Sequence, residues 1–192
     1  MEKLGVFGGT FNPIHNGHLS LCTQICDALG LSKVLLIPTA IPPHKRVDEL
    51  ADGRHRLAMC RLAVQGDPRF FVCDLELRRQ GNSYTADTLR ELEEIYPNTR
   101  FFLLMGTDMF LTVQNWYHAQ EIFRRAILVA GARKKGEEEL LKEQLSLLEA
   151  LRARQDCPLS GRQAFFYPGA RRTQTRREFK RHGSAGSGSV YE

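Results

Sequence analysis

Residues 8–18 constrain the fold more than any other part of this 192-residue chain. They read Gly-Gly-Thr-Phe-Asn-Pro-Ile-His-Asn-Gly-His and follow an apolar run, Leu-Gly-Val-Phe, at residues 4–7. This order is typical of a buried strand that turns on glycines and feeds a helix. The first turn of such a helix has unpaired backbone N–H groups and positive dipole charge, which together suit a phosphate. His15 and His18 add titratable positive charge at the same point.

Apolar runs alternate with amphipathic stretches along the rest of the chain. We expect strands over residues 3–7, 33–38, 70–75, 100–105 and 126–130, and helices over residues 18–29, 54–64, 84–95 and 137–154. The alternation implies parallel strands joined by right-handed crossovers, with ligands bound beyond the carboxyl ends of the strands. A chain of this length can bury one substantial core, so the sequence predicts a single α/β domain.

Four segments of unusual composition directly follow predicted strands. They are residues 8–18, the proline-rich residues 38–45, residues 106–108 and residues 131–135. A parallel sheet brings the carboxyl ends of its strands to one edge. We therefore expect these four segments to meet there and to form the ligand site.

Charge argues against a nucleic-acid partner. The net charge is +5, but much of the excess comes from six residues near the C-terminus: Arg171, Arg172, Arg176, Arg177, Lys180 and Arg181. Without that segment the balance is close to neutral, whereas a nucleic-acid-binding fold would spread positive charge over one face. We therefore expect no nucleic acid among the partners.

Hydropathy and cysteine usage predict a cytoplasmic protein. No stretch approaches the roughly 20 consecutive apolar residues of a membrane span, so we expect no membrane association. Strand-like sequence begins at Lys3, which leaves no room for a signal peptide. The five cysteines include no Cys-x-x-Cys pair, and we interpret them as small buried hydrophobic residues rather than metal ligands.

Several of these residues resemble one enzyme family. His15-Asn16-Gly17-His18 is similar to the (His/Thr)-x-Gly-His motif of a nucleotidyltransferase superfamily, and the preceding Gly-Gly-Thr-Phe-Asn-Pro resembles its nicotinate-nucleotide adenylyltransferase branch. Further likeness lies in Pro43-His44-Lys45, residues 83–89, Gly106-Thr107-Asp108 and Trp116-Tyr117. The resemblance implies a single Rossmann-like nucleotidyltransferase domain over residues 1–170.

The resemblance also implies the reaction. ATP and nicotinate mononucleotide would give nicotinate adenine dinucleotide and pyrophosphate, a step of NAD biosynthesis, with Mg²⁺ accompanying the ATP. Adenylyl transfer joins two anionic groups, so it requires positive charge, backbone donors and in-line geometry rather than a protein nucleophile.

The resemblance assigns roles to individual residues, none of them as a protein ligand to a metal. The implied catalytic residues are His15 and His18. The implied ATP-binding residues are Gly8, Gly9, Thr10, Phe11, Gly17, Gly106, Asp108, Arg133, Thr173 and Arg176, and the implied acceptor-binding residues are His44, Lys45, Tyr84, Thr85, Trp116 and Tyr117.

Purely structural roles compete with several of these assignments. A glycine pair such as Gly8 and Gly9 can simply turn the chain. Helix capping accounts for Thr85, because Ser83 and Thr85 are the caps expected for the helix over residues 84–95, and loop-turn chemistry accounts for Asp108. Core packing is the competing account of Trp116, the only tryptophan.

The sequence departs from the family pattern near its end. The family has Ile-Ser-Ser-Thr-x-Ile-Arg opening a helix, whereas residues 170–176 read Ala-Arg-Arg-Thr-Gln-Thr-Arg, so only Thr173 and Arg176 align. We therefore expect residues 171–192, which are basic and rich in glycine and serine, to form a separate, poorly ordered segment.

Other functions stay open at this point. One alternative is the same chemistry on nicotinamide mononucleotide or another phosphorylated acceptor. A second is a nucleotide- or nucleic-acid-binding module that uses the basic C-terminal segment. The sequence also leaves the oligomeric state open, a homodimer included.

Overall fold

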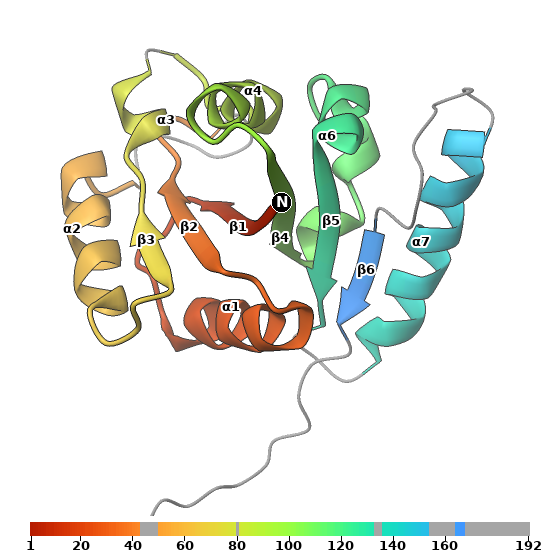
Figure 1. Ribbon diagram of the computed structural model, residues 1–192, viewed down its shortest axis with the longest axis horizontal. Coiled ribbons are helices and arrows are strands. Elements are labelled where there is room, and N and C mark those ends of the chain that lie inside the picture. Colours follow the sequence, from red (N-terminus) through yellow and green to blue (C-terminus); the bar gives the residue numbers. More distant parts are fainter. Residues whose placement is uncertain (43–49, 80, 133–135, 154–163, 168–192) are drawn as a thin grey trace, which may run out of the picture.

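Six parallel strands form the centre of the structure, in the order β3-β2-β1-β4-β5-β6 (Figure 1). They are β1 (Glu2–Gly9), β2 (Lys33–Pro38), β3 (Phe70–Val72), β4 (Thr99–Gly106), β5 (Ala126–Gly131) and β6 (Ala164–Tyr167). The computed structural model describes residues 1–42, 50–79, 81–132, 136–153 and 164–167. The predicted parallel α/β sheet of a Rossmann-like fold is confirmed.

The helices connect successive strands and cover both faces of the sheet (Figure 1). They are α1 (Asn16–Leu29), α2 (Gly53–Val64), α3 (Leu75–Arg78), α4 (Thr85–Ile95), α5 (Thr107–Phe110), the 3₁₀-helix η2 (Val113–Asn115), α6 (Ala119–Arg125) and α7 (Glu137–Ala153). Helices α1 and α2 lie against one face, and helices α4, α6 and α7 lie against the other.

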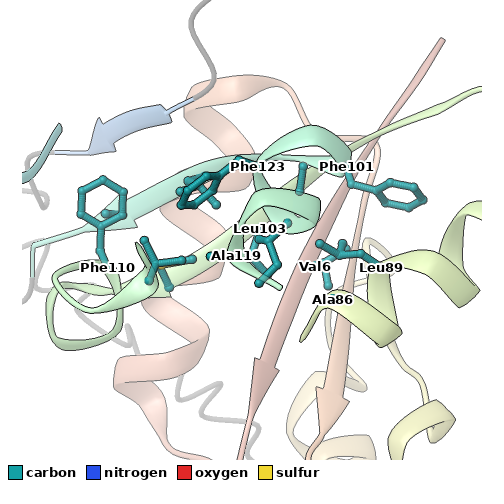
Figure 2. Packing of buried hydrophobic residues seen from close by; sticks show 14 of the residues in the cluster. Val6, Ala86, Leu89, Phe101, Leu103, Phe110, Ala119 and Phe123 are labelled. Carbon is teal, nitrogen blue, oxygen red and sulfur yellow. The ribbon is translucent and has the colours of Figure 1, made fainter. Parts of the chain in front are cut away.

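Side-chain alternation along the strands divides the core between these two faces. In β4, Phe101 and Leu103 point to the face of α4, α6 and α7, whereas Phe102 and Leu104 point to the face of α1. Figure 2 shows the first cluster, in which Leu103 lies among residues of β1, α4 and α6. Because both faces are covered, the strands are apolar in nearly continuous runs, as expected for a buried parallel sheet.

Helix α1 packs tightly onto its face of the sheet. Its buried stripe consists of Leu21, Cys22, Ile25 and Cys26. A Cβ at Gly131, the last residue of β5, would collide with the Leu21 side chain, so the absence of that atom allows the close approach. The helix ends at Gly30, which adopts the left-handed conformation with φ of 60°.

Some element boundaries differ from the predictions. The strand expected over residues 70–75 ends at Val72, because Asp74 begins the short helix α3. Strand β6 was not predicted, since four residues are too short for a periodic signal. The C-terminal segment 171–192 lies outside the described residues.

Two sequence interpretations can be compared directly with the coordinates. Among the described residues, no helix has the length and apolar character needed to cross a bilayer. Cys22, Cys26 and Cys60 are buried thiols, and Cys73 is half-buried. The predicted burial is therefore confirmed for Cys22, Cys26 and Cys60 but not for Cys73, and Cys157 lies outside the described residues.

Candidate active site

The carboxyl ends of four strands meet at one edge of the sheet, as expected. Gly9 pairs with Pro38, so β1 and β2 end side by side, and Gly106 pairs with Gly131, so β4 and β5 do the same. The strand order reverses between β1 and β4, where the two adjacent connections leave for opposite faces of the sheet. Such a switch point is the usual place for a nucleotide in this class of fold.

The two histidines lie together at the amino end of α1. His15 is the residue immediately before the helix, and His18 is the third residue within it. Their rings stack with centroids 3.7 Å apart and planes inclined by 26°. The His15 backbone N–H donates to Nδ1 of His18 at 3.3 Å, which leaves the proton of a neutral His18 ring on Nε2.

Two neighbouring residues hold this stack in place. A Cβ at Gly17 would lie only 3.0 Å from Nδ1 of His15, so the glycine leaves room for that ring to fold over the first turn. Phe11 is 2% exposed and meets the His18 ring edge-on, with centroids 5.3 Å apart. The Phe11 ring therefore packs against the His18 ring, and the centroid of the Phe7 ring lies 5.9 Å from that of His18.

The loop after β1 offers open space next to the histidines. Gly8 is exposed, and a Cβ placed there would meet no protein atom within 4 Å. At Gly9 a Cβ would press against the Phe11 ring at 3.1 Å. Gly8 thus leaves a place where a ligand can approach the backbone, whereas Gly9 makes room for a buried ring.

Electrostatics favour an anion at this end of α1. The helix is 14 residues long, and its first turn contains no acidic residue. Its positive dipole end is therefore not neutralised by its own side chains, unlike that of α7, whose first turn carries Glu137, Glu138 and Glu139.

The second group of predicted site residues surrounds the amino end of α4. Tyr84 precedes the helix and Thr85 is its first residue, but neither side chain caps it. The predicted capping role of Ser83 and Thr85 is therefore wrong, because the Ser83 hydroxyl instead accepts the Ala40 N–H at 3.0 Å. The Ser83 N–H donates to the Ile41 carbonyl at 3.0 Å, which ties this segment to the loop after β2.

Tyr84 and Tyr117 are brought together although 33 positions separate them. Their rings lie 4.3 Å apart at 31°, and the Tyr84 hydroxyl accepts from Asn82 at 3.2 Å. Tyr117 is half exposed. Trp116 is half-buried against the core, and its Nε1–H donates to the Thr112 hydroxyl at 3.3 Å.

Asp108 lies at the exit of β4, beside the switch point. It is exposed on the short helix α5, which begins immediately after Gly106. The hydroxyl of the neighbouring Thr107 donates to Glu137 at 2.8 Å, so the start of α7 is attached to this edge of the site.

Sequence reasoning missed a buried arginine in α2. Arg56 is 2% exposed and donates to four backbone carbonyls, those of Thr10, Thr39, Ala40 and Ala51. Burial lowers the pKa of Arg56, although an arginine stays charged under ordinary conditions. In this helix the buried residues are Arg56 and Cys60, and Arg61 is exposed.

A buried glutamate in α3 was missed as well. Glu76 is 5% exposed, and its Oε1 accepts from the Thr88 hydroxyl at 2.7 Å, while Oε2 has no hydrogen-bond partner among the described residues. Burial raises the pKa of Glu76, and the neighbouring hydroxyls and Arg79 partly oppose this shift. No periodic signal in the sequence distinguishes this residue from an exposed glutamate.

Five predicted site residues lie outside the described residues: His44, Lys45, Arg133, Thr173 and Arg176. Within the described part of the chain, no group of three or more His, Cys, Asp and Glu side chains is arranged to hold a metal ion.

Comparison with known sequences identifies a family. The model of the cytidylyltransferase-like family matches residues 6–175. A nicotinate-nucleotide adenylyltransferase of Bacillus subtilis is 41% identical over 122 residues, which cover 64% of this chain and 65% of that protein. A protein of Lachnoclostridium phytofermentans described as a "Probable nicotinate-nucleotide adenylyltransferase" is 36% identical over 155 residues, which cover 80% of this chain and 78% of that protein.

Comparison with solved structures supports the fold. A Plasmodium falciparum nicotinic acid mononucleotide adenylyltransferase complexed with NaAD has a TM-score of 0.68 and 16% sequence identity. The match covers 89% of this chain and 78% of that one. The matched part of this chain spans between 61% and 65% of the length of several of these relatives.

Proposed function

Because this chain belongs to the nicotinate-nucleotide adenylyltransferase family, within the cytidylyltransferase-like proteins, we propose that it transfers the adenylyl group of ATP to nicotinate mononucleotide. The products are nicotinate adenine dinucleotide and pyrophosphate. This assignment makes the protein an enzyme of NAD biosynthesis.

The stacked pair of histidines at the amino end of α1 carries the proposal. His15 and His18 lie at the carboxyl end of β1, next to the open space above Gly8. An imidazole pair, a positive helix end and exposed backbone meet there. Each of these features favours a phosphate that gains negative charge.

The chemistry follows from that arrangement. An oxygen of the acceptor phosphate attacks the α-phosphorus of ATP, the bond from that phosphorus to the bridging oxygen breaks, and pyrophosphate leaves in line. His18, with its proton on Nε2, and His15 donate hydrogen bonds to the non-bridging oxygens of the α-phosphate as charge develops on them. No side chain forms a covalent intermediate.

We assign the acceptor to the residues around the start of α4. Helix α4 is 11 residues long and begins at Thr85, and the backbone N–H groups of such a first turn suit the pyridine carboxylate. The rings of Tyr84, Tyr117 and Trp116 supply flat apolar surface for the pyridine ring. His44 and Lys45 would bind the acceptor phosphate, and Asp108 would accept hydrogen bonds from the adenosine ribose.

The remaining ATP contacts are part of the same proposal. Gly8, Gly9, Thr10 and Gly17 would present backbone to the phosphates, and Gly106 would do so next to Asp108. Phe11 contributes by supporting His18. Arg133, Thr173 and Arg176 would add charge and a hydroxyl on the triphosphate side.

Mg²⁺ would enter with the triphosphate, whose charge it neutralises. A magnesium ion of this kind keeps several waters and is held mainly by substrate phosphates. The described residues offer no cluster of carboxylates for it. The four described cysteines are free thiols, which fits the cytoplasmic location we propose.

Pyrophosphate release tests the proposal. The purified chain is incubated with ATP, Mg²⁺ and either nicotinate or nicotinamide mononucleotide, with pantetheine phosphate as a third acceptor. We expect turnover with nicotinate mononucleotide to exceed turnover with the amide. Preference for another acceptor would contradict the substrate assignment, and absence of turnover with all three would contradict the enzyme assignment.

A further inference from the structure

Arg56 is buried and forms no ion pair with a described residue, although the nearby Asp52 carboxylate partly opposes the lowering of its pKa by burial. Its guanidinium is covered by the loops that precede α2 and follow β1 and β2, and the residue is 2% exposed. Removing a charge from water is costly unless hydrogen bonds compensate for it. Four of the five N–H groups of Arg56 donate to backbone carbonyls, so the hydrogen bonds that compensate for burial come from the main chain.

The four carbonyls belong to three separate segments. Nη1 donates to Thr10, in the loop after β1, and to Thr39, in the loop after β2, both at 2.7 Å. Nη2 donates to Ala40 at 3.4 Å. Nε donates at 2.9 Å to Ala51, whose own N–H donates to Asn12 Oδ1 at 3.1 Å. The Nη1 atom of Arg56 therefore hydrogen-bonds to both of the loops that follow the neighbouring strands β1 and β2.

These two loops serve opposite halves of the proposed site. Thr10 continues into the turn that leads to His15 and His18, the half that would receive the α-phosphate of ATP. Thr39 and Ala40 belong to the half that would receive the acceptor. Ala40 bonds to Ser83, which immediately precedes Tyr84, and the Thr39 N–H donates to Gly9 at 2.9 Å.

We propose that Arg56 is a positioning residue that sets the acceptor half of the site against the adenylyl-donor half. It contacts neither substrate. Its planar fork reaches carbonyls in directions that a lysine ammonium cannot reach together. This inference rests on the proposed adenylyl transfer, in which the attacking oxygen and the α-phosphorus must approach to within about 3–3.5 Å.

The proposal predicts a specific kinetic change. Each half of the site keeps its own contacts when Arg56 is replaced, so each substrate still binds. Transfer between the halves slows, because a misplacement of about 1 Å costs on the order of 100-fold in rate. A residue that only stabilised the fold would instead reduce the fraction of competent protein.

Two variants and one control separate these cases. Arg56→Lys keeps the charge and loses the fork, Arg56→Met removes every donor, and Arg61→Lys makes the same conservative change at an exposed position of the same helix. Calorimetric titration with a non-hydrolysable ATP analogue and with nicotinate mononucleotide gives both dissociation constants and the number of competent sites. Steady-state pyrophosphate release gives kcat per competent site.

For Arg56→Lys we expect kcat per competent site to fall by about 10- to 100-fold, with both dissociation constants within about threefold of those of the unaltered protein. Arg61→Lys should match the unaltered protein. If Arg56→Met does not fold, the lysine variant alone decides. An unchanged kcat in Arg56→Lys, or a loss explained fully by fewer competent sites, would overturn the proposal.

Amide hydrogen exchange supplies a readout that does not depend on activity. In Arg56→Lys, exchange should accelerate together at residues 9–11 and at Thr39 and Ala40, while the amides of β4 stay protected. Unchanged exchange in both loops would refute the connection, and so would faster exchange throughout the protein. If the unaltered protein turns over no acceptor, the proposed function fails, and the exchange result still decides whether Arg56 joins the loops.

Discussion

Replacing Gly17 with alanine should separate catalysis from stability. The new Cβ would lie 3.0 Å from Nδ1 and 3.1 Å from Cε1 of His15. Comfortable contacts between such atoms are about 3.5–4.0 Å, so the His15 ring has to move by roughly 0.5 Å. The ring is exposed and stacked on His18, so it yields more easily than the helix does.

The expected magnitude follows from that displacement. A misplacement of about 1 Å costs on the order of 100-fold in rate, so roughly 0.5 Å corresponds to about a 10-fold fall in kcat. Stability should change in the opposite direction, because alanine favours a helix over glycine by up to about 1 kcal/mol. The variant should therefore melt at the same temperature as the unaltered protein or higher, while turning over more slowly.

Steady-state pyrophosphate release and thermal unfolding measure the two effects on one preparation. Gly66→Ala is the matched control, because a Cβ at that position would meet no atom within 4 Å. A Gly17→Ala variant with full activity would show that the exact place of the His15 ring is unimportant. A variant that lost activity only in proportion to a lost fold would refute the separation of the two properties.

Four further substitutions test other parts of the structure. His18→Ala should lower kcat by on the order of 100-fold or more in the same assay, with an unchanged circular dichroism spectrum, because it removes a donor used mainly in the transition state. Gly8→Ala adds a methyl group to open space, so we expect a raised KM for ATP without loss of thermal stability. Burial raises the pKa of Glu76, so ionisation of its carboxyl group lowers the stability of the folded protein as the pH rises. In urea unfolding, Glu76→Gln should therefore match the unaltered protein near pH 4 and be more stable than it at about pH 8. Leu89→Ala, at a position with no exposed surface, should reduce the free energy of unfolding by about 2–5 kcal/mol in the same measurement.

Most of the sheet and the meeting of its strand ends could be predicted from the sequence. Continuous apolar runs mark β1, β2, β4 and β5, and glycine or proline ends each of them, so the sequence alone indicates that their carboxyl ends lie at one edge. The histidine pair was predictable for the same reason, because its spacing and its position after β1 depend only on local sequence.

The supporting residues were not predictable in this way. Arg56 lies on an amphipathic helix where an arginine is normally exposed, and its burial depends on carbonyls from three segments, two of them distant in sequence. Ser83 resembled a helix cap, but its hydroxyl accepts from Ala40, a partner 43 residues away. Contacts of this kind arise from tertiary structure, and a single sequence carries no periodic trace of them.

The close packing of α1 on the sheet connects buried side chains to the positions of His15 and His18. The turns after the histidines carry Leu21, Cys22, Ile25 and Cys26, and Leu21 occupies the space left by the missing Cβ of Gly131. A bulkier residue at any of these positions would roll the helix about its axis or lift it from the strands, and both imidazoles would swing with it. Substitutions of buried residues under this helix should therefore alter turnover even though they lie far from any ligand.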